Sequence, residues 1–272
     1  MPWLKIALLA GVCSTSVAMA AEDPARLALH AELGSLYVAY HTIQLDRGGS
    51  EIDYIDDLGQ ENLVPFARAS ADLRLGGSHV ITLMYQPLEI ESRRTLARDL
   101  VIDDATFTAG SAVRARYSFP FARVSYLYDF WEGEDELGLG VSLQLRNAII
   151  EFEEIGGDTF RSRRDVGPVP VLKFRWRQSV SPRWFVGAEV DGFYAPIEYL
   201  NGGDSDVVGA IVDASVRAGV ELRQGAEAYL NLRWLGGGAE GGGEDDDNPG
   251  DGYNENWLSF IALSLGLSYT GL

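Results

Sequence analysis

The chain has 272 residues, of which 40 are acidic and 22 are lysine or arginine, and its formal net charge is −18. A chain this acidic is unsuited to binding nucleic acid, because the phosphates would repel it. The single cysteine, Cys13, lies close to the N-terminus, so neither a disulfide framework nor thiol chemistry is expected in the bulk of the chain.

The N-terminal segment has the layout of a secretory signal peptide. Lys5 precedes an apolar run over residues 6–12, and Ala18-Met19-Ala20 forms a cleavage site with small residues at its first and third positions. The apolar run is much shorter than the ~20 residues that a transmembrane helix needs. We therefore predict a signal peptide over residues 1–20 and an exported protein over residues 21–272.

The rest of the chain repeatedly alternates apolar and polar residues. In residues 207–222 the even positions carry only valine, alanine or leucine, whereas the odd positions include Asp213 and Arg217. Because side chains alternate across a β-strand, each such segment has one apolar and one polar face. Ten strands are predicted, over residues 27–45, 63–75, 79–91, 108–130, 137–153, 166–178, 184–198, 207–222, 227–235 and 257–270.

These strands are too long for a typical soluble sandwich, where about 5–6 residues is the mode. Residues 257–270 have an aliphatic face with Trp257 and Tyr269 at its ends, as in strands that cross a bilayer between two aromatic girdles. A closed barrel lets such strands pair every backbone group in lipid. We predict an all-β fold, a transmembrane antiparallel up-and-down β-barrel of ten strands, with eight or twelve as alternatives. A β-bulge is expected near Pro120, which lacks an amide hydrogen.

The whole exported chain resembles small bacterial outer-membrane β-barrels. The segments "VGPVPVLKFR", "DGFYAPIEYLNG" and "RWLGGGAEG" are similar to uncharacterised proteins of that class. The resemblance implies a location in the outer membrane of a Gram-negative bacterium. The even number of predicted strands places both chain ends in the periplasm. The resemblance also implies the lipid bilayer, lipopolysaccharide and the outer-membrane assembly machinery as partners.

The polar strand faces carry many charges of both signs, and we predict that they form a charge network in the lumen. The predicted network consists of Arg114, Arg116, Arg146, Lys173, Arg175, Arg177, Glu189, Asp191, Asp213, Arg217 and Arg233. The same faces also carry Arg68, Arg74, Arg123, Glu32, Asp72, Asp129, Glu221 and Glu227. Buried charges are tolerated when they are paired, so we expect Glu189 and Asp191 to face the basic side chains of strand 166–178. Such a lumen is either a structural filling or a narrow, porin-like path for a small solute.

An outer-membrane hydrolase, of protease or lipid deacylase type, is the alternative function. His41 is predicted near the extracellular rim, where omptin proteases and lipid A deacylases place a histidine. No local motif matches either family, so no catalytic residue is assigned, and no cofactor is expected.

Two predicted extracellular loops, 46–62 and 236–256, are strongly acidic. Carboxylates at this density are suited to binding Ca²⁺ or Mg²⁺, but their spacing lacks the order of an EF-hand. We expect solvated acidic loops, with divalent cations as the alternative partners and no assigned metal ligand.

Overall fold

The computed structural model describes residues 25–131, 133–196, 207–242 and 251–271. The predicted signal peptide lies outside these ranges, and so does the acidic run of residues 244–247. No helix within the described ranges is long and apolar enough to cross a membrane.

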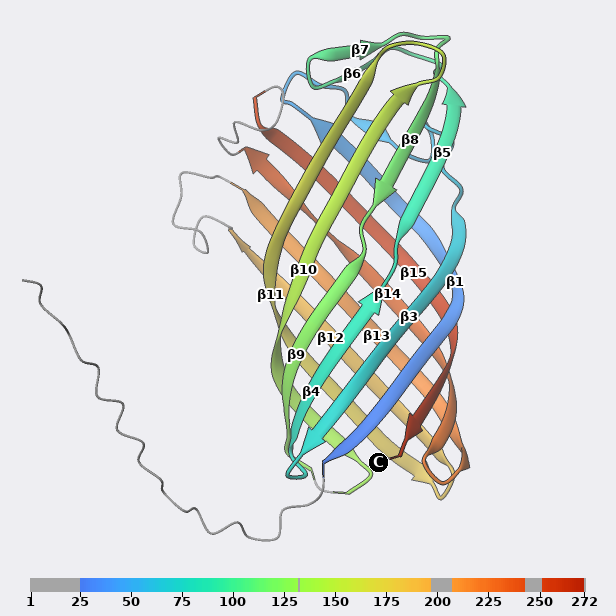
Figure 1. Cartoon of the computed structure of the whole chain (residues 1–272), viewed down its shortest axis with the longest axis vertical. Helices are drawn as coiled ribbons and strands as arrows, with labels where there is room; N and C mark the ends of the chain where they lie inside the picture. Colours follow the sequence, from blue (N-terminus) through green and yellow to red (C-terminus); the bar gives the residue numbers. More distant parts are fainter. Residues whose placement is uncertain (1–24, 132, 197–206, 243–250, 272) are drawn as a thin grey trace, which may run out of the picture.

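The chain folds into a closed antiparallel β-barrel of ten strands, which confirms the predicted fold class and strand number (Figure 1). The barrel strands are β1 (Arg26–Leu45), β3 (Leu63–Leu75), β4 (His79–Gln86) continued by β5 (Glu89–Thr95), β8 (Ala112–Ser118) continued by β9 (Phe121–Asp129), β10 (Glu136–Glu154), β11 (Phe160–Ser181), β12 (Trp184–Pro196), β13 (Val208–Arg223), β14 (Ala226–Gly242) and β15 (Tyr253–Thr270). Pairing of β1 with β15 closes the barrel. Three short strands, β2 (Ile52–Asp53), β6 (Leu100–Ile102) and β7 (Ala105–Phe107), lie in the connections.

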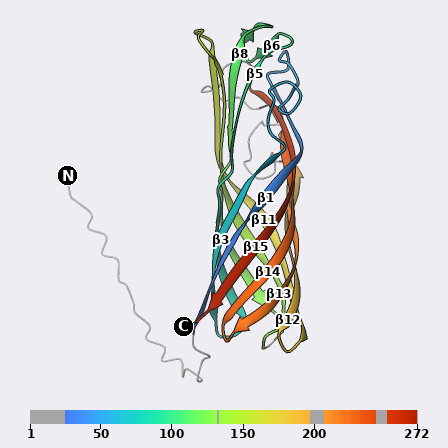
Figure 2. The ribbon, with the colours of Figure 1, turned by 90° about the vertical axis from the view of Figure 1, so that its right-hand side faces the viewer.

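The two ends of the barrel differ in their connections. The short turns lie at the end where β1 begins and β15 finishes, which we call the turn end. The long connections lie at the opposite, loop end, where β5, β8, β10 and β11 extend furthest (Figures 1 and 2). Some strands are longer than predicted there: β11 already begins at Phe160, and β14 continues to Gly242 through a segment that was expected to be loop.

The outer surface of the barrel carries a belt of exposed apolar side chains. On β15, Leu263 and Leu265 are 52% and 71% exposed, whereas Ser264 between them is buried. Exposed aromatic residues lie at both edges of the belt. Tyr37, Tyr40 and Trp234 lie toward the loop end, and Tyr128, Trp184 and Tyr269 lie toward the turn end. An apolar exterior between two aromatic girdles is what a barrel surrounded by lipid requires.

Proline residues interrupt two neighbouring walls of the barrel. Pro87 separates β4 from β5, and Pro120 separates β8 from β9. The amide of Phe119 donates to the carbonyl of Leu88 at 2.8 Å, which keeps the two interrupted walls together. The predicted β-bulge at Pro120 is wrong: the strand breaks there, because proline cannot donate to the ladder, but β8 and β9 keep the same register with β10.

A β-bulge in β1 changes which of its residues face the lumen. The register with β15 shifts between Val38 and Tyr40, so Val38 and His41 are both buried while Tyr37 and Tyr40 both face outward. The extra residue at a bulge reverses the alternation of the strand. His41 therefore points into the barrel instead of lying on its rim.

Candidate functional site

Two long connections fold into the loop end of the barrel and fill it. We call these segments, residues 52–60 and 96–107, the loop plug. Several of their apolar side chains, among them Leu58, Leu100 and Phe107, are at most 1% exposed and pack with Val38 and Phe260 of the wall in one hydrophobic cluster. The first acidic loop thus turns apolar residues inward while Asp56 and Glu61 stay exposed. These buried side chains fill the lumen at the loop end.

His41 lies inside this plug and is fully buried. Its ring stacks on Tyr54 with the ring centroids 4.0 Å apart, and its Nδ1 atom is 2.8 Å from Oε1 of Gln60. Tyr117 packs edge-on against the same ring. Burial raises the pKa of the Tyr54 hydroxyl well above its usual range, so this residue of the plug is uncharged. Within the described residues, no serine or carboxylate is hydrogen-bonded to His41, so His41 does not form the rim site that a hydrolase would need.

The loop plug is held by an ion pair at its surface. Arg98 donates two hydrogen bonds to Asp57, at 3.0 and 2.8 Å, and a third to the carbonyl of Glu51 at 2.7 Å. Burial alone would raise the pKa of Asp57, but the hydrogen bonds and charge of Arg98 outweigh burial, and this pKa lies below its ordinary value. Arg98 therefore links the two segments of the plug electrostatically.

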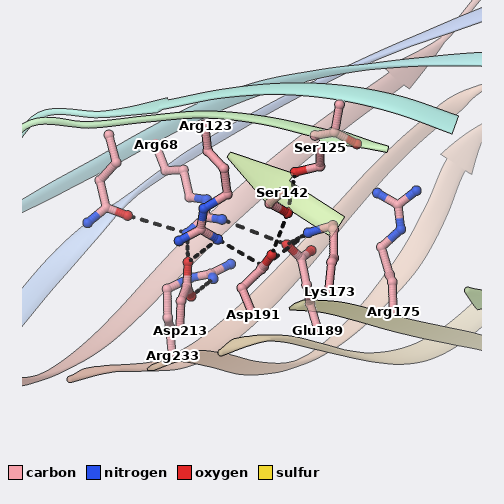
Figure 3. Close-up of polar contacts among 12 residues, drawn as sticks. Arg68, Arg123, Ser125, Ser142, Lys173, Arg175, Glu189, Asp191, Asp213 and Arg233 are labelled. Atoms are coloured by element: carbon pink, nitrogen blue, oxygen red, sulfur yellow. Dashed lines mark hydrogen bonds and ion pairs between the residues drawn. The ribbon is translucent and has the colours of Figure 1, made fainter. Parts of the chain in front are cut away.

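Below the plug, a layer of charged side chains crosses the lumen. We call it the ionic layer; it consists of Glu32, Arg68, Arg123, Lys173, Glu189, Asp191, Asp213 and Arg233, all at most 12% exposed. Four cations and four carboxylates therefore balance in charge. Because β3 and β9 lie across the barrel from β12 and β13, contacts between these side chains span the lumen (Figure 3).

Asp213 lies at the centre of the ionic layer. Its carboxylate accepts from Arg68 at 2.9 Å, from Arg123 at 3.2 Å and from Arg233. The side chain of Asp213 is only 1% exposed. Charge-assisted hydrogen bonds from several guanidinium groups are needed to make such a buried carboxylate tolerable. Asp213 thus joins three parts of the barrel wall at one point.

Glu189 and Asp191 complete the layer from β12. Lys173 donates to Glu189 at 2.6 Å and to Asp191 at 3.0 Å. Asp191 also pairs with Arg123 at 2.9 Å and accepts from Ser142 at 3.1 Å. Two carboxylates therefore lie in an otherwise apolar strand because cations on both neighbouring and opposite walls need counter-charges.

The other basic side chains of β11 have different partners from those expected. Arg175 pairs with Glu136 and, at 2.7 Å, with Asp72. Arg177 forms a bidentate pair with Glu227, with hydrogen bonds of 2.6 and 3.0 Å. Lys173, Arg175 and Arg177 were all expected to pair with Glu189 and Asp191. Only Lys173 contacts these two carboxylates. Long arginine side chains instead reach acids nearer the turn end.

Two predicted members of the lumen network lie outside the barrel. Arg114 pairs with Glu153 at 2.9 Å, and Arg116 pairs with Glu89 and Glu151 at 3.0 Å each, all on the outer surface. Tyr117 and its inward neighbours Val113 and Ala115 are buried. The prediction for Arg114 and Arg116 is therefore wrong, because β8 lies nearer the loop end than the apolar belt, where the outside is polar and the inside apolar.

The structure brings the remaining predicted residues to the lumen, with one exception. Arg217 faces the lumen below Glu189, from which it is 3.7 Å away. The side chain of Arg146 lies outside the described residues. Two lumen residues were not predicted: Gln144, which accepts from Arg123 at 2.6 Å, and Glu136, which pairs with Arg175. Gln144 could have been found from its place on the polar face of its strand, whereas Glu136 precedes the predicted strand and was assigned to a turn.

A vestibule opens below the ionic layer at the turn end. Its volume is about 470 Å³, and its lining includes residues of the turns, such as Pro182 and Gln224. Ten lysine and arginine side chains line it, together with seven carboxylates. Within the described residues, no group of three or more histidine, cysteine or acidic side chains could hold a metal ion. The vestibule is therefore a polar cavity that opens at the turn end, and the ionic layer closes its inner end.

No protein-family model and no curated protein matches this chain. Among solved structures, the outer-membrane protease OmpT of Escherichia coli is similar over 93% of this chain and 99% of its own, with 11% identity and a TM-score of 0.39. The transport unit of the autotransporter AIDA-I of Escherichia coli is similar over 94% of both chains, with 10% identity and a TM-score of 0.42. Ail of Yersinia pestis is similar over 90% of this chain and 98% of its own, with 8% identity and a TM-score of 0.33.

These likenesses are distant, and no function is carried from them. The closed barrel of ten strands, its apolar belt and its aromatic girdles make this chain an outer-membrane-type β-barrel on their own.

Proposed function

We propose that this protein is a non-conducting outer-membrane barrel that takes up a small solute in its vestibule. The observation that carries the proposal is the ionic layer, which crosses the lumen above a cavity of about 470 Å³. A volume in the range of about 300–1,000 Å³ is typical of small-molecule sites. A barrel closed at mid-height with a cavity open at one end is suited to binding and unsuited to free diffusion.

The proposal places the turn end in the periplasm. Barrels of this class keep their short turns on the periplasmic side and their long loops outside. Solute would then enter from the periplasm. Lipid and lipopolysaccharide would surround the belt, and the assembly machinery would insert the barrel.

A small-solute pore, the other form of the expectation from sequence, would need two barriers to open. The ionic layer would have to separate several buried ion pairs, and the loop plug would have to expose residues such as Leu58 and Phe107, which are at most 1% exposed. Conduction requires sites that bind weakly enough for solutes to leave, and neither barrier offers that.

Planar-bilayer recording of the full exported chain tests the closed state. We expect no steady conductance level above that of the bare bilayer at moderate voltage. A stable, reproducible open level in most insertions would overturn the proposal. As a positive control, the double variant Asp213→Ala/Leu58→Ala, which opens space in both barriers, should show more frequent current steps than the parent.

A further inference from the structure

The vestibule reverses the charge balance of the chain. The whole sequence has 40 acidic against 22 basic side chains, but the vestibule is lined by ten basic side chains and seven carboxylates. Nearly half of the lysine and arginine residues are therefore gathered around one cavity. Such a concentration attracts anions, because low-dielectric walls focus the field of the lining charges.

Three of the carboxylates that pair with these cations are buried behind the cavity wall. Asp191, Asp213 and Asp129 are at most 1% exposed and do not line the vestibule. The cations are more accessible: Arg74 and Arg177 are each 26% exposed. A solute in the vestibule thus meets more basic than acidic side chains, because part of the balancing negative charge does not line the cavity.

Three of the vestibule arginines, Arg26, Arg183 and Arg217, lack a carboxylate at hydrogen-bond distance in the described part of the chain. Arg217 is 3.7 Å from Glu189, which already accepts from Lys173 at 2.6 Å. Arg183 donates only to the backbone carbonyl of Glu221, at 3.1 and 3.3 Å. Arg217 and Glu221 both belong to β13, so the two guanidinium groups lie along the same wall of the vestibule.

We propose that the vestibule binds a small organic anion through a carboxylate or phosphate group, with Arg217 and Arg183 as its principal contacts. A guanidinium group presents paired N–H donors that match the oxygens of both groups. This inference rests on the proposed vestibule function and names its solute class. The more fully paired arginines of the ionic layer close the inner end of the vestibule, which limits how deep the anion can enter.

Isothermal titration calorimetry on the folded full barrel in detergent micelles tests the inference with three probes of matched length. These are succinate, the neutral succinamide and the dication 1,4-diaminobutane, with inorganic phosphate as a second oxyanion. We expect succinate and phosphate to bind at one site, at least tenfold more tightly than succinamide, and the diamine not to bind there. Raising the ionic strength from about 0.05 to 0.3 M should weaken succinate binding several-fold, because salt screens the cations.

Matched charge removals locate the site. Arg217→Gln and Arg183→Gln should each weaken succinate binding about tenfold, whereas Arg93→Gln, on the exposed outer surface near the loop end, should leave it unchanged. Arg183 is exposed and contacts only a carbonyl, so its variant keeps the test valid if Arg217→Gln fails to fold.

Each contrary result has a distinct meaning. Equal binding of succinamide or of the diamine would overturn the anion inference but leave a solute-binding vestibule. Binding of no probe at millimolar concentration would overturn both the inference and the uptake of a solute. Steady conductance would overturn the closed barrel alone, and binding that is lost equally in Arg93→Gln would place the anion elsewhere.

Discussion

The two halves of the barrel use the same wall in opposite ways. In the turn half the inside is charged and the outside apolar, with Glu32 buried in the lumen and Leu33 70% exposed on the belt. In the loop half the inside is apolar and the outside charged, with Tyr117 buried and Arg116 paired to Glu151 on the surface. Except at bulges such as the one in β1, the strands keep alternating between an inner and an outer face, but the surroundings of the barrel change from lipid to water.

This inversion determines which half can hold a solute. Apolar side chains and loops fill the loop half to a close-packed core, as in a soluble protein. The turn half contains charged side chains that must stay hydrogen-bonded, and their pairing leaves a cavity of about 470 Å³ beneath them. On β1 the lumen face changes from charged to apolar between Glu32 and Leu36, which are four residues apart.

Among these predictions, removal of the central carboxylate should lower the stability of the barrel most. Asp213→Asn leaves three guanidinium groups without their shared counter-charge, at an expected loss of about 3–5 kcal/mol in the free energy of unfolding. Urea titration of the folded barrel in micelles measures it. The control, Glu153→Gln, removes one exposed partner of Arg114 and should cost less than about 1 kcal/mol. Equal losses in the two variants would mean that the ionic layer is not buried.

The outside of the turn half can be tested in the same way. Leu263→Arg places a charge in the apolar belt and should destabilise the barrel in lipid by about 2–4 kcal/mol. Arg114→Leu, the opposite exchange on the outside of the loop half, should change stability by less than about 1 kcal/mol, because the site faces water. If lipid vesicles tolerate Leu263→Arg as well as the parent, the belt is misplaced.

A cavity in the loop plug should have a smaller effect. Leu58→Ala removes a buried side chain of the plug, at about 2 kcal/mol, the low end for buried leucine, because a connection can settle into the space. Thermal unfolding followed by tryptophan fluorescence checks the loss. Succinate affinity in the vestibule should stay the same, since the ionic layer separates the two halves. A large change in that affinity would show that the halves are coupled.

The smallest expected effect is on the surface of the plug. The pKa of Asp57 is lowered in the folded state, so its pairing with Arg98 stabilises the protein above the ordinary carboxyl pKa and is lost as pH falls through the lowered value. The stability difference between the parent and Arg98→Gln should be about 0.2–1 kcal/mol at pH 7. It should shrink toward zero in strong acid, and a difference that persists there would show that Arg98 acts by packing.

The period of two in the sequence was enough to predict the barrel and its ten strands, because lipid imposes one face on every strand that crosses it. It failed for Arg114 and Arg116. Polar and apolar residues still alternate where β8 passes beyond the belt, but there the polar face is outside and the apolar face is inside. It also failed at β14, where glycine and glutamate after Leu235 suggested a loop but pair with β13 as far as Glu240.

The ionic layer was predictable in its members more than in its pairing. Lys173, Glu189 and Asp191 were found from the polar faces of adjacent strands. The contact of Arg123 with Asp191 joins β9 to β12, which are separated by two other strands in the barrel, and local patterns carry no information about it. The burial of His41 depends on a bulge near Ala39. No proline or glycine at that position would allow the bulge to be predicted from the sequence.

Sided chemical labelling tests the central claim, that the lumen opens at the turn end alone, most directly. The predicted exported chain has no cysteine, so Ser70→Cys places a single thiol in the vestibule. A membrane-impermeant thiol reagent is added outside liposomes, with a protease site in the turn at residues 76–78 reporting which barrels face the reagent. We predict labelling only in barrels whose turn end faces the reagent. Labelling of Ser70→Cys from the loop end would contradict the closed lumen.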